Sequence, residues 1–256
     1  DSGTLEFFRG DTIGWENIVR TTPNLGGGSG SNIGVGVRGI YSCGSHPGDN
    51  EINNINYLTI STQGNSTDFG DAIGQRRQGT ALASTTRALD IAGYDGSSKR
   101  DTIGYVTIAT TGDSTSFGTL ANVRIGHPAG FASQTRGIVA GGENPSNTNS
   151  IEYLTIATLG NGQEFGDINN ALQGASGGGS STRGIIAGGF TPTVLNVIDY
   201  ITISTLGDAV DFGDLTQARR GASKGQSNNS TRFVMYGGQT PSYVNTIDYV
   251  TIATLG

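Results

Sequence analysis

The chain is built from a repeat of about 48 residues, and this repeat limits the possible folds more than any other feature. Five segments of the form Tyr-(Leu/Val/Ile)-Thr-Ile-(Ser/Ala)-Thr recur, with tyrosines separated by 48, 48, 47 and 49 residues. Self-similarity with a fixed period of roughly 20–50 residues is typical of solenoids, propellers and related arrays. The tyrosines are Tyr57, Tyr105, Tyr153, Tyr200 and Tyr249.

Three further motifs keep their phase relative to the tyrosines. Before each tyrosine lies an arginine-led apolar segment, and before the later arginines lies a segment of tiny residues such as Gly-Thr-Ala-Leu-Ala-Ser from Gly79. A phenylalanine follows four of the tyrosines by 12 residues. The arginines are Arg38, Arg87, Arg136, Arg183 and Arg232, and the phenylalanines are Phe69, Phe117, Phe165 and Phe212.

Each unit therefore contains four short strand candidates separated by turn residues. The tyrosine strand carries apolar or β-branched residues on both faces, which suits a sheet covered on both sides. We predict an all-β fold, a kelch-like β-propeller with one four-stranded blade per unit. The tiny segment is the innermost strand, followed outward by the arginine, tyrosine and phenylalanine strands. The 43 glycines fit narrow inner strands and tight turns better than disorder, and an open solenoid is the alternative.

The two ends of the sequence predict how the ring closes. The segment around Trp15 aligns with the phenylalanine strand around Phe212, and Gly256 has the phase of Gly10. We expect five blades, with the N-terminal strand around Trp15 completing the last one, which removes free sheet edges. Residues 1–9, including the spare strand Leu5–Phe8, then form a linker, and residues 10–256 form one propeller domain. Since Asp1 is not methionine, we expect processing or an excised fragment.

The repeat resembles kelch. Glycine pairs such as Gly141-Gly142 and Gly188-Gly189 close the arginine strand, although the first two units lack the full pair and read Cys43-Gly44 and Gly93-Tyr94. Segments such as Ile198–Thr205 with Asp211–Leu215 look like kelch-like repeats of marine bacteriophage tail and fibre proteins, cyanophages especially. That resemblance implies a virion or otherwise extracellular location, with other virion proteins and a host-surface glycan or protein as partners.

Composition excludes several other partners. The formal net charge is −6, whereas nucleic-acid binding needs a basic face, so no nucleic-acid partner is expected. No apolar run approaches the roughly 18 residues of a membrane span, and no membrane insertion is expected. A single cysteine, Cys43, allows neither an internal disulfide nor a cysteine zinc cluster.

The loops between the arginine and tyrosine strands vary most from unit to unit, and binding residues often lie on loops over a rigid scaffold. Their Asn, Asp and aromatic residues suit sugar hydroxyls and ring stacking. Sequence drift in unconstrained loops explains the variation equally well. The candidate ligand-binding residues are His46, Asp49, Tyr94, Asp95, Glu143, Asn144, Phe190, Gln239 and Tyr243.

Other chemical sites have plainer explanations. The repeated arginines would form either an anion-binding ring or structural contacts with carboxylates or carbonyls at strand starts. Acids such as Asp208, Asp211 and Asp214 suit calcium or, more simply, turns in which they bond their own backbone. His46 and His127 are expected to be loop residues. We therefore predict no catalytic residues, no metal and no cofactor.

Three functions remain open at this point. The first is a non-catalytic phage tail or fibre component that recognises a host-surface ligand through its loops. The second is a purely structural module of virion assembly. The third is a glycan-degrading propeller enzyme, which would need paired carboxylates facing one cleft.

Overall fold

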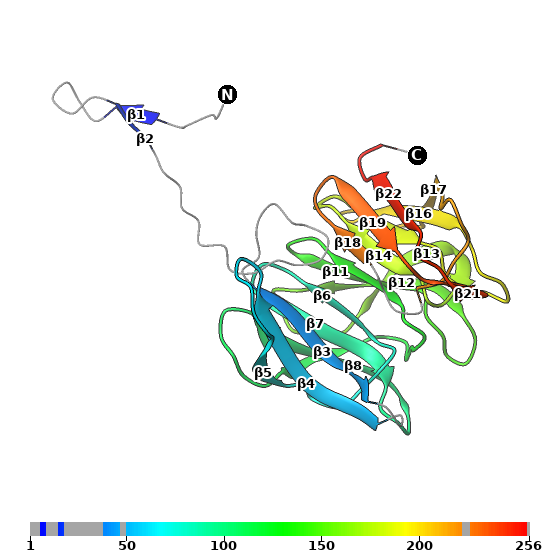
Figure 1. Ribbon diagram of the computed structural model, residues 1–256, viewed down its shortest axis with the longest axis horizontal. Coiled ribbons are helices and arrows are strands. Elements are labelled where there is room, and N and C mark those ends of the chain that lie inside the picture. Colours follow the sequence, from blue (N-terminus) through cyan, green and yellow to red (C-terminus); the bar gives the residue numbers. More distant parts are fainter. Residues whose placement is uncertain (1–5, 9–14, 18–37, 47–49, 222–225, 255–256) are drawn as a thin grey trace.

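The computed structural model describes residues 6–8, 15–17, 38–46, 50–221 and 226–254 (Figure 1). All regular elements in this part of the chain are strands, so the predicted all-β class is confirmed. No helix long and apolar enough to span a membrane occurs among the described residues. The strands are β1 (Glu6–Phe8), β2 (Trp15–Asn17), β3 (Arg38–His46), β4 (Asn50–Thr59), β5 (Thr67–Asp71), β6 (Thr80–Ala83), β7 (Arg87–Tyr94), β8 (Lys99–Thr107), β9 (Thr115–Thr119), β10 (Ala129–Ala132), β11 (Arg136–Ala140), β12 (Thr148–Thr155), β13 (Gln163–Leu172), β14 (Ser176–Gly179), β15 (Arg183–Ala187), β16 (Val197–Thr202), β17 (Val210–Asp214), β18 (Gln226–Asn228), β19 (Arg232–Tyr236), β20 (Gln239–Thr240), β21 (Ser242–Tyr243) and β22 (Ile247–Thr251).

Five antiparallel sheets follow the five sequence units. Sheet 1 is β3-β4-β5, sheet 2 is β6-β7-β8-β9, sheet 3 is β10-β11-β12-β13, sheet 4 is β14-β15-β16-β17 and sheet 5 is β18-β19-β22. Within each sheet the strands pair in the order predicted from the tiny, arginine, tyrosine and phenylalanine segments. We call the end with the loops after β3, β7, β11, β15 and β19 the loop rim, and the opposite end the turn end.

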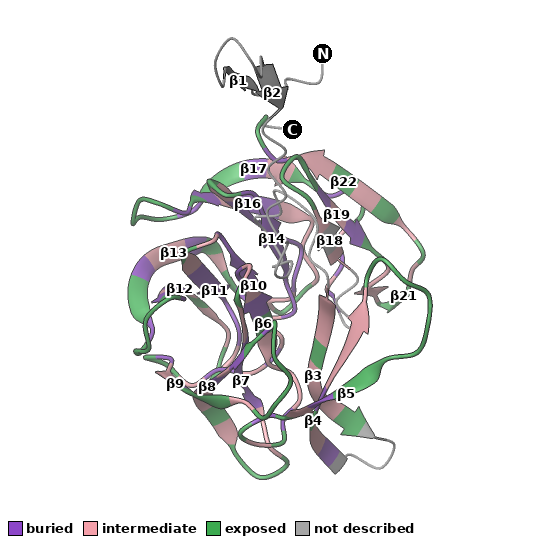
Figure 2. Cartoon of the chain, turned by 90° about the vertical axis from the view of Figure 1, so that its left-hand side faces the viewer, coloured by how far each residue is buried: buried purple, intermediate pink, exposed green. Residues whose placement is uncertain are grey.

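The tiny strands face one another, as expected for inner strands. β6 contacts β10, β10 contacts β14, and β14 contacts β18, and Figure 2 shows these strands on the inner side of their sheets. A side chain at Gly178 of β14 would put its Cβ 2.5 Å from the ring of Phe233. Small residues are therefore required here because neighbouring sheets approach too closely for larger ones.

Hydrophobic cores lie between neighbouring sheets. Between sheets 2 and 3, Leu89, Ile103 and Phe117 of sheet 2 pack with Val139 and Leu154 of sheet 3. The cores between the other consecutive sheets use the same positions. In four units the conserved spacing of tyrosine and phenylalanine produces an edge-to-face ring pair, with centroids 5.9–6.3 Å apart.

The outer strands are hydrogen-bonded to the next sheet at the turn end. Gly112 N donates to Phe69 O at 2.7 Å, Gly160 N to Phe117 O at 3.0 Å, and Gly207 N to Phe165 O at 2.9 Å. The edges of β5, β9 and β13 are thereby covered, which protects them from pairing with other chains.

The N-terminal strand pairs differently from our expectation. β2, which contains Trp15, pairs with β1 and not with β22, so sheet 5 has three described strands and the predicted closure by this strand is wrong in this structure. The spare strand Leu5–Phe8 supplies the partner, since Phe8 lies opposite Trp15. A strand only a few residues away closes a much smaller loop than one more than 200 residues away, and this favours the local pair.

Candidate binding rim

The loop rim is organised by the residue pair that ends each arginine strand. The second member is glycine in every unit, with φ between 106° and 127°. The first member also has a left-handed φ, 64–68° for glycine but 61° for Cys43 and 59° for Ala92. The pair in unit 2 is therefore Ala92-Gly93, and the sequence alignment with Gly93-Tyr94 was wrong by one residue. Cys43 and Ala92 keep the turn despite the cost of this conformation for residues with a Cβ.

After this pair, the chain forms one antiparallel bridge to the segment that leads into the inner strand. Four predicted site residues occupy this equivalent position on the rim. The bridges are Arg77 with Tyr94, Ile125 with Glu143, Gln173 with Phe190, and Arg220 with Gln239. The repeat thus places these four candidates on one rim, one per sheet.

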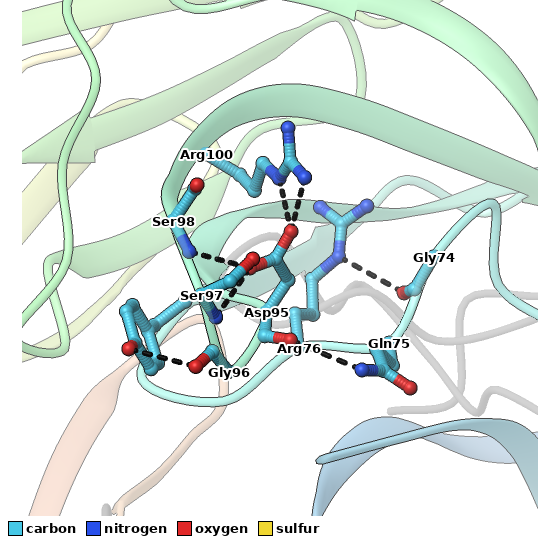
Figure 3. A network of polar contacts seen from close by, with 9 residues as sticks. Gly74, Gln75, Arg76, Asp95, Gly96, Ser97, Ser98 and Arg100 are labelled. Atoms are coloured by element: carbon cyan, nitrogen blue, oxygen red, sulfur yellow. Dashed lines mark hydrogen bonds and ion pairs between the residues drawn. The ribbon is translucent and has the colours of Figure 1, made fainter.

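Asp95 organises the first of these loops (Figure 3). Its Oδ1 accepts hydrogen bonds from Ser97 N at 2.9 Å and Ser98 N at 2.6 Å, and its carboxylate pairs with Arg100. These backbone donors, followed by Arg100, hold the pKa of Asp95 below its usual range. Tyr94 Oη donates to Gly96 O at 2.9 Å. The carboxylate is therefore committed to shaping its own loop.

Glu143 joins two neighbouring sheets. Its Oε2 accepts a hydrogen bond from Gln173 Nε2 at 2.8 Å, and Lys99 Nζ lies 3.7 Å from Oε1. The following residue, Asn144, is exposed and its N donates to Ser146 O at 2.9 Å. Of these two predicted site residues, only Asn144 projects from the rim without a described side-chain partner.

Phe190 and Gln239 are brought together by Arg220. The Arg220 guanidinium lies 5.0 Å from the centroid of Phe190, and its Nη2 donates to Gln239 Oε1 at 2.8 Å. Asn147 Nδ2 also donates to Phe190 O at 2.8 Å. These contacts tie sheets 3, 4 and 5 to one another along the rim.

Tyr243 is a strongly exposed candidate residue. It lies on β21, opposite Gln239 in the short β20-β21 hairpin, and its side chain is 77% exposed. Its ring is open for stacking against a ligand. Among the other candidates, His46 pairs with Asn50 in the backbone register, but its side chain and the whole of Asp49 lie outside the described residues.

Buried arginines lie directly beneath the rim, seven residues after the phenylalanine in three units. The burial of this position was not predicted from the sequence, although its constant spacing from phenylalanine was a usable signal. Arg124 and Arg219 are fully buried and bind Glu152 and Asp248. Arg76 instead lies 3.4 Å from Asp90. Asp90 lies on the arginine strand of sheet 2, β7, whereas Glu152 and Asp248 lie on the tyrosine strands of their sheets.

Unit 3 has Leu172 at the arginine position, which leaves Asp199 of sheet 4 without the equivalent cation. Asp199 is 2% exposed and accepts hydrogen bonds from Asn169 N at 3.2 Å and Asn169 Nδ2 at 2.6 Å. Burial raises the pKa of Asp199, and the bonds from Asn169 oppose this only in part. Burial likewise raises the pKa of Asp90 despite Arg76, and that of the Cys43 thiol to about 12.

The five repeated arginines are occupied by structural contacts at the turn end. Each guanidinium lies 4.5–4.8 Å from the ring centroid of the tyrosine in its own sheet. Four of them also donate to a carbonyl of the next sheet. These bonds join Arg38 to Ile108 O at 2.7 Å, Arg87 to Ile156 O at 2.8 Å, Arg136 to Ile203 O at 2.6 Å and Arg183 to Ile252 O at 2.8 Å. This geometry favours the structural interpretation over an anion-binding ring.

The repeated acidic turns also make contacts between sheets. Asp113 Oδ1 accepts a bond from Asp71 N at 2.9 Å, and Asp208 Oδ1 accepts one from Asp167 N at 3.0 Å. Asn161, which carries no charge, does the same for Thr119 N at 3.1 Å. No group of three His, Cys, Asp or Glu residues suited to a metal occurs in the described part of the chain. Since Asn161 accepts the same bond as Asp113 and Asp208, a side-chain oxygen that accepts a hydrogen bond is sufficient for this contact.

Comparison with known proteins adds no relative: no protein-family model matches the chain, and no curated protein matches it.

Proposed function

We propose that the five sheets are the blades of a kelch-like β-propeller, and that the chain is a non-catalytic bacteriophage tail or fibre module whose loop rim recognises a host-surface glycan or protein. The observation that carries the binding role is the difference between the two ends of the sheets. Contacts at the turn end repeat from sheet to sheet, whereas each loop at the rim has its own sequence and its own partners. A rigid scaffold with variable loops is a common arrangement for recognition.

Tyr243 is the best-placed ligand contact. Its exposed ring lies on the same hairpin as Gln239, and Phe190 lies on the other side of Arg220. An aromatic ring supplies stacking area, and neighbouring amides supply hydrogen bonds to hydroxyl groups. Because the contacts are few, one copy of the chain would bind a ligand weakly. Several copies on one particle would strengthen binding through avidity.

A glycan array with the purified chain, displayed in several copies, tests this proposal. We expect binding that the Tyr243→Ala variant loses and that the Leu206→Ala variant retains. Leu206 is the matched control because it is 59% exposed but lies at the turn end. Binding by Tyr243→Ala equal to that of the unmodified chain would exclude the rim as the recognition surface.

A second candidate, a purely structural module of virion assembly, is supported by a different observation. Asp95, Glu143, Phe190 and Gln239 all have partners within the chain. Absence of any glycan or host-surface ligand would favour this candidate, and electron microscopy of the parent particle would then show which proteins cover the rim. The enzyme alternative would need paired carboxylates facing one cleft, whereas the carboxylates of Asp95 and Glu143 are engaged by Arg100 and by Gln173.

A further inference from the structure

Most of the exposed large hydrophobic residues of this protein lie in units 1 and 5. Ten such residues are exposed in the described part of the chain, and only Leu159, Leu206 and Val210 belong to units 3 and 4. An apolar surface concentrated in this way marks an interaction site. The seven in units 1 and 5 are Tyr41, Ile60, Ile73, Tyr236, Tyr243, Ile247 and Tyr249.

On sheet 5 the exposed face corresponds to the face that the other sheets bury against the following sheet. Ile247 of β22 is 69% exposed, while Ile198, the equivalent residue of sheet 4, is 1% exposed in the core between sheets 4 and 5. Tyr236 lies opposite Ile247 on β19, Tyr249 lies two residues after it on β22, and both tyrosines are exposed. This face therefore has the residues of an inter-sheet core but no described partner.

On sheet 1 the exposed face is the one that the other sheets bury against the preceding sheet. Ile60 is 58% exposed, while the equivalent Ile156 is 1% exposed and packs against sheet 2. Tyr41 of β3 is exposed, whereas Val139 at its position in sheet 3 is buried in the same core. The two faces are thus the two halves of the interface that joins every other neighbouring pair.

The arginine contacts show the same complementarity. Four of the five repeated arginines donate to the carbonyl of an isoleucine in the next sheet, and Arg232 is the fifth arginine of this set. It stacks on Tyr249 at 4.6 Å, as the others stack on their own tyrosines, but donates to no carbonyl of another sheet within the described residues. Ile60 is the one isoleucine of this position whose carbonyl receives no such bond there, since Ile108, Ile156, Ile203 and Ile252 are already paired.

We propose that sheet 5 binds sheet 1 of the same molecule through these faces, with Arg232 donating to Ile60 O and Tyr236, Ile247 and Tyr249 packing against Tyr41 and Ile60. This inference rests on the propeller arrangement proposed above and identifies the residues that close it. The same molecule is the partner because the two sheets already approach each other: one cavity of about 810 Å³ is lined by Tyr41 and Ser42 of β3 and by Gln226 of β18.

Thiol labelling tests the interface directly. Ile60→Cys and Leu159→Cys place cysteines at positions that are 58% and 56% exposed, so an open surface predicts equal labelling rates with a thiol reagent. Closure predicts that Cys at position 60 reacts at least ten times more slowly than Cys at position 159. The native Cys43 gives little background, since its pKa of about 12 leaves almost no thiolate at neutral pH.

The concentration dependence of labelling identifies the partner. The protein is shown to be a monomer by light scattering, and labelling is repeated at lower protein concentration. Slow labelling of position 60 that persists on dilution supports closure within one molecule. Equal labelling rates would overturn the interface, and protection lost on dilution would overturn the intramolecular form in favour of head-to-tail association between copies. Arg232→Ala should raise the labelling rate at position 60, whereas Arg136→Ala should leave it unchanged. None of these outcomes depends on ligand binding, so failure here is distinct from failure of the proposed recognition role.

Discussion

The turn end and the loop rim connect the same neighbouring sheets by opposite means. At the turn end, one set of contacts is used again and again: an arginine to a carbonyl, a glycine amide to a phenylalanine carbonyl, and an Asp or Asn side chain to an amide. At the loop rim, the buried charge is balanced in three ways: Arg124 and Arg219 pair with the acid before the repeat tyrosine, Arg76 pairs with Asp90, and Asp199 is bound by Asn169. A side chain that bonds to a backbone group does not depend on the identity of the residue that supplies that group. A pair of side chains does depend on both residues, so a change in one requires a change in the other. The contacts at the turn end are therefore uniform, and those at the loop rim vary from sheet to sheet.

The largest expected effect is at the loop rim, where removing one member of a buried pair leaves the other uncompensated. Glu152→Gln leaves the fully buried Arg124 without its carboxylate and should lower the free energy of unfolding by about 3–5 kcal/mol, measured by urea denaturation. Asp68→Asn, an exposed acid on β5, is the control with little effect. Adding Arg124→Leu should recover part of the loss, because unit 3 has Leu172 there; no recovery would show that the charge pair is not the cause.

The next largest effect tests whether equivalent glycines at the turn end contribute equally to stability. Gly166 has a φ of 150°, and an added Cβ would lie 2.5 Å from the carbonyl carbon of Gly207. We expect Gly166→Ala to cost about 2–3 kcal/mol through strain and overlap. Gly118→Ala should cost the same, since its φ is 156° and it faces Gly160. Gly74→Ala, which has open space, is the control. Clearly unequal costs at positions 118 and 166 would contradict a uniform turn end.

A somewhat smaller effect is expected from the arginine contacts. Arg136→Ala removes a charged hydrogen bond and a cation–π contact, which together contribute about 2 kcal/mol. Arg183→Ala removes the same two contacts in sheet 4 and should give the same decrease within about 0.5 kcal/mol. Thermal unfolding of the two variants under the same conditions checks this. A difference of several degrees in Tm would show that equivalent arginine contacts contribute unequally to stability.

The smallest effect is a difference in pH dependence between Asp199 and Asp248, which occupy the same position in sheets 4 and 5. Burial raises the pKa of Asp199 above its unfolded value, so ionised Asp199 destabilises the fold and this cost disappears as the pH falls. Burial alone would raise the pKa of Asp248 as well, but bonds from Thr216 and Arg219 outweigh burial and lower it. Its contribution is therefore present at neutral pH and is lost at acidic pH.

Asn variants at the two positions should consequently respond in opposite directions. Between about pH 7 and pH 3, which spans the ordinary pKa of Asp near 3.9, the Tm of Asp199→Asn should fall relative to the unmodified chain. The Tm of Asp248→Asn should rise relative to it over the same range. Parallel pH profiles for the two variants would mean that Arg219 does not distinguish the two carboxyl groups.

Much of the architecture was predictable because it repeats. Phe165 follows Tyr153 by 12 residues, and the equivalent pairs have the same separation in sequence. This constant separation identified two strands of each unit, since side chains alternate regularly between the two faces of a strand. The rim residues Glu143 and Phe190 lie between strands, as predicted, whereas Tyr94 is the last residue of β7 and Gln239 the first of β20, so the loop assignment was wrong for these two. The partners of all four residues were not predictable. Contacts such as Arg220 with Phe190 join different units, and no local pattern specifies them.

The buried arginines and the strand around Trp15 show where sequence reasoning failed. The burial of Arg124 was not predicted, since charged side chains are rarely buried, and it depends on the position of Glu152 in the folded sheet. Trp15 matched a phenylalanine strand, yet two strands, β1 and β22, have the sequence to pair with it. Similarity between repeats cannot distinguish a local partner from a distant one.

The sequence by itself determined the all-β class, the number of units and the order of strands within each sheet, because strand periodicity and turn chemistry act over a few residues. Tertiary structure decided which charges are buried together, which loop residues have partners within the chain, and which apolar faces of sheets 1 and 5 have no described partner. These depend on distances between side chains from different units. Such distances arise only when neighbouring sheets pack, and a repeat with nearly identical units leaves them unspecified.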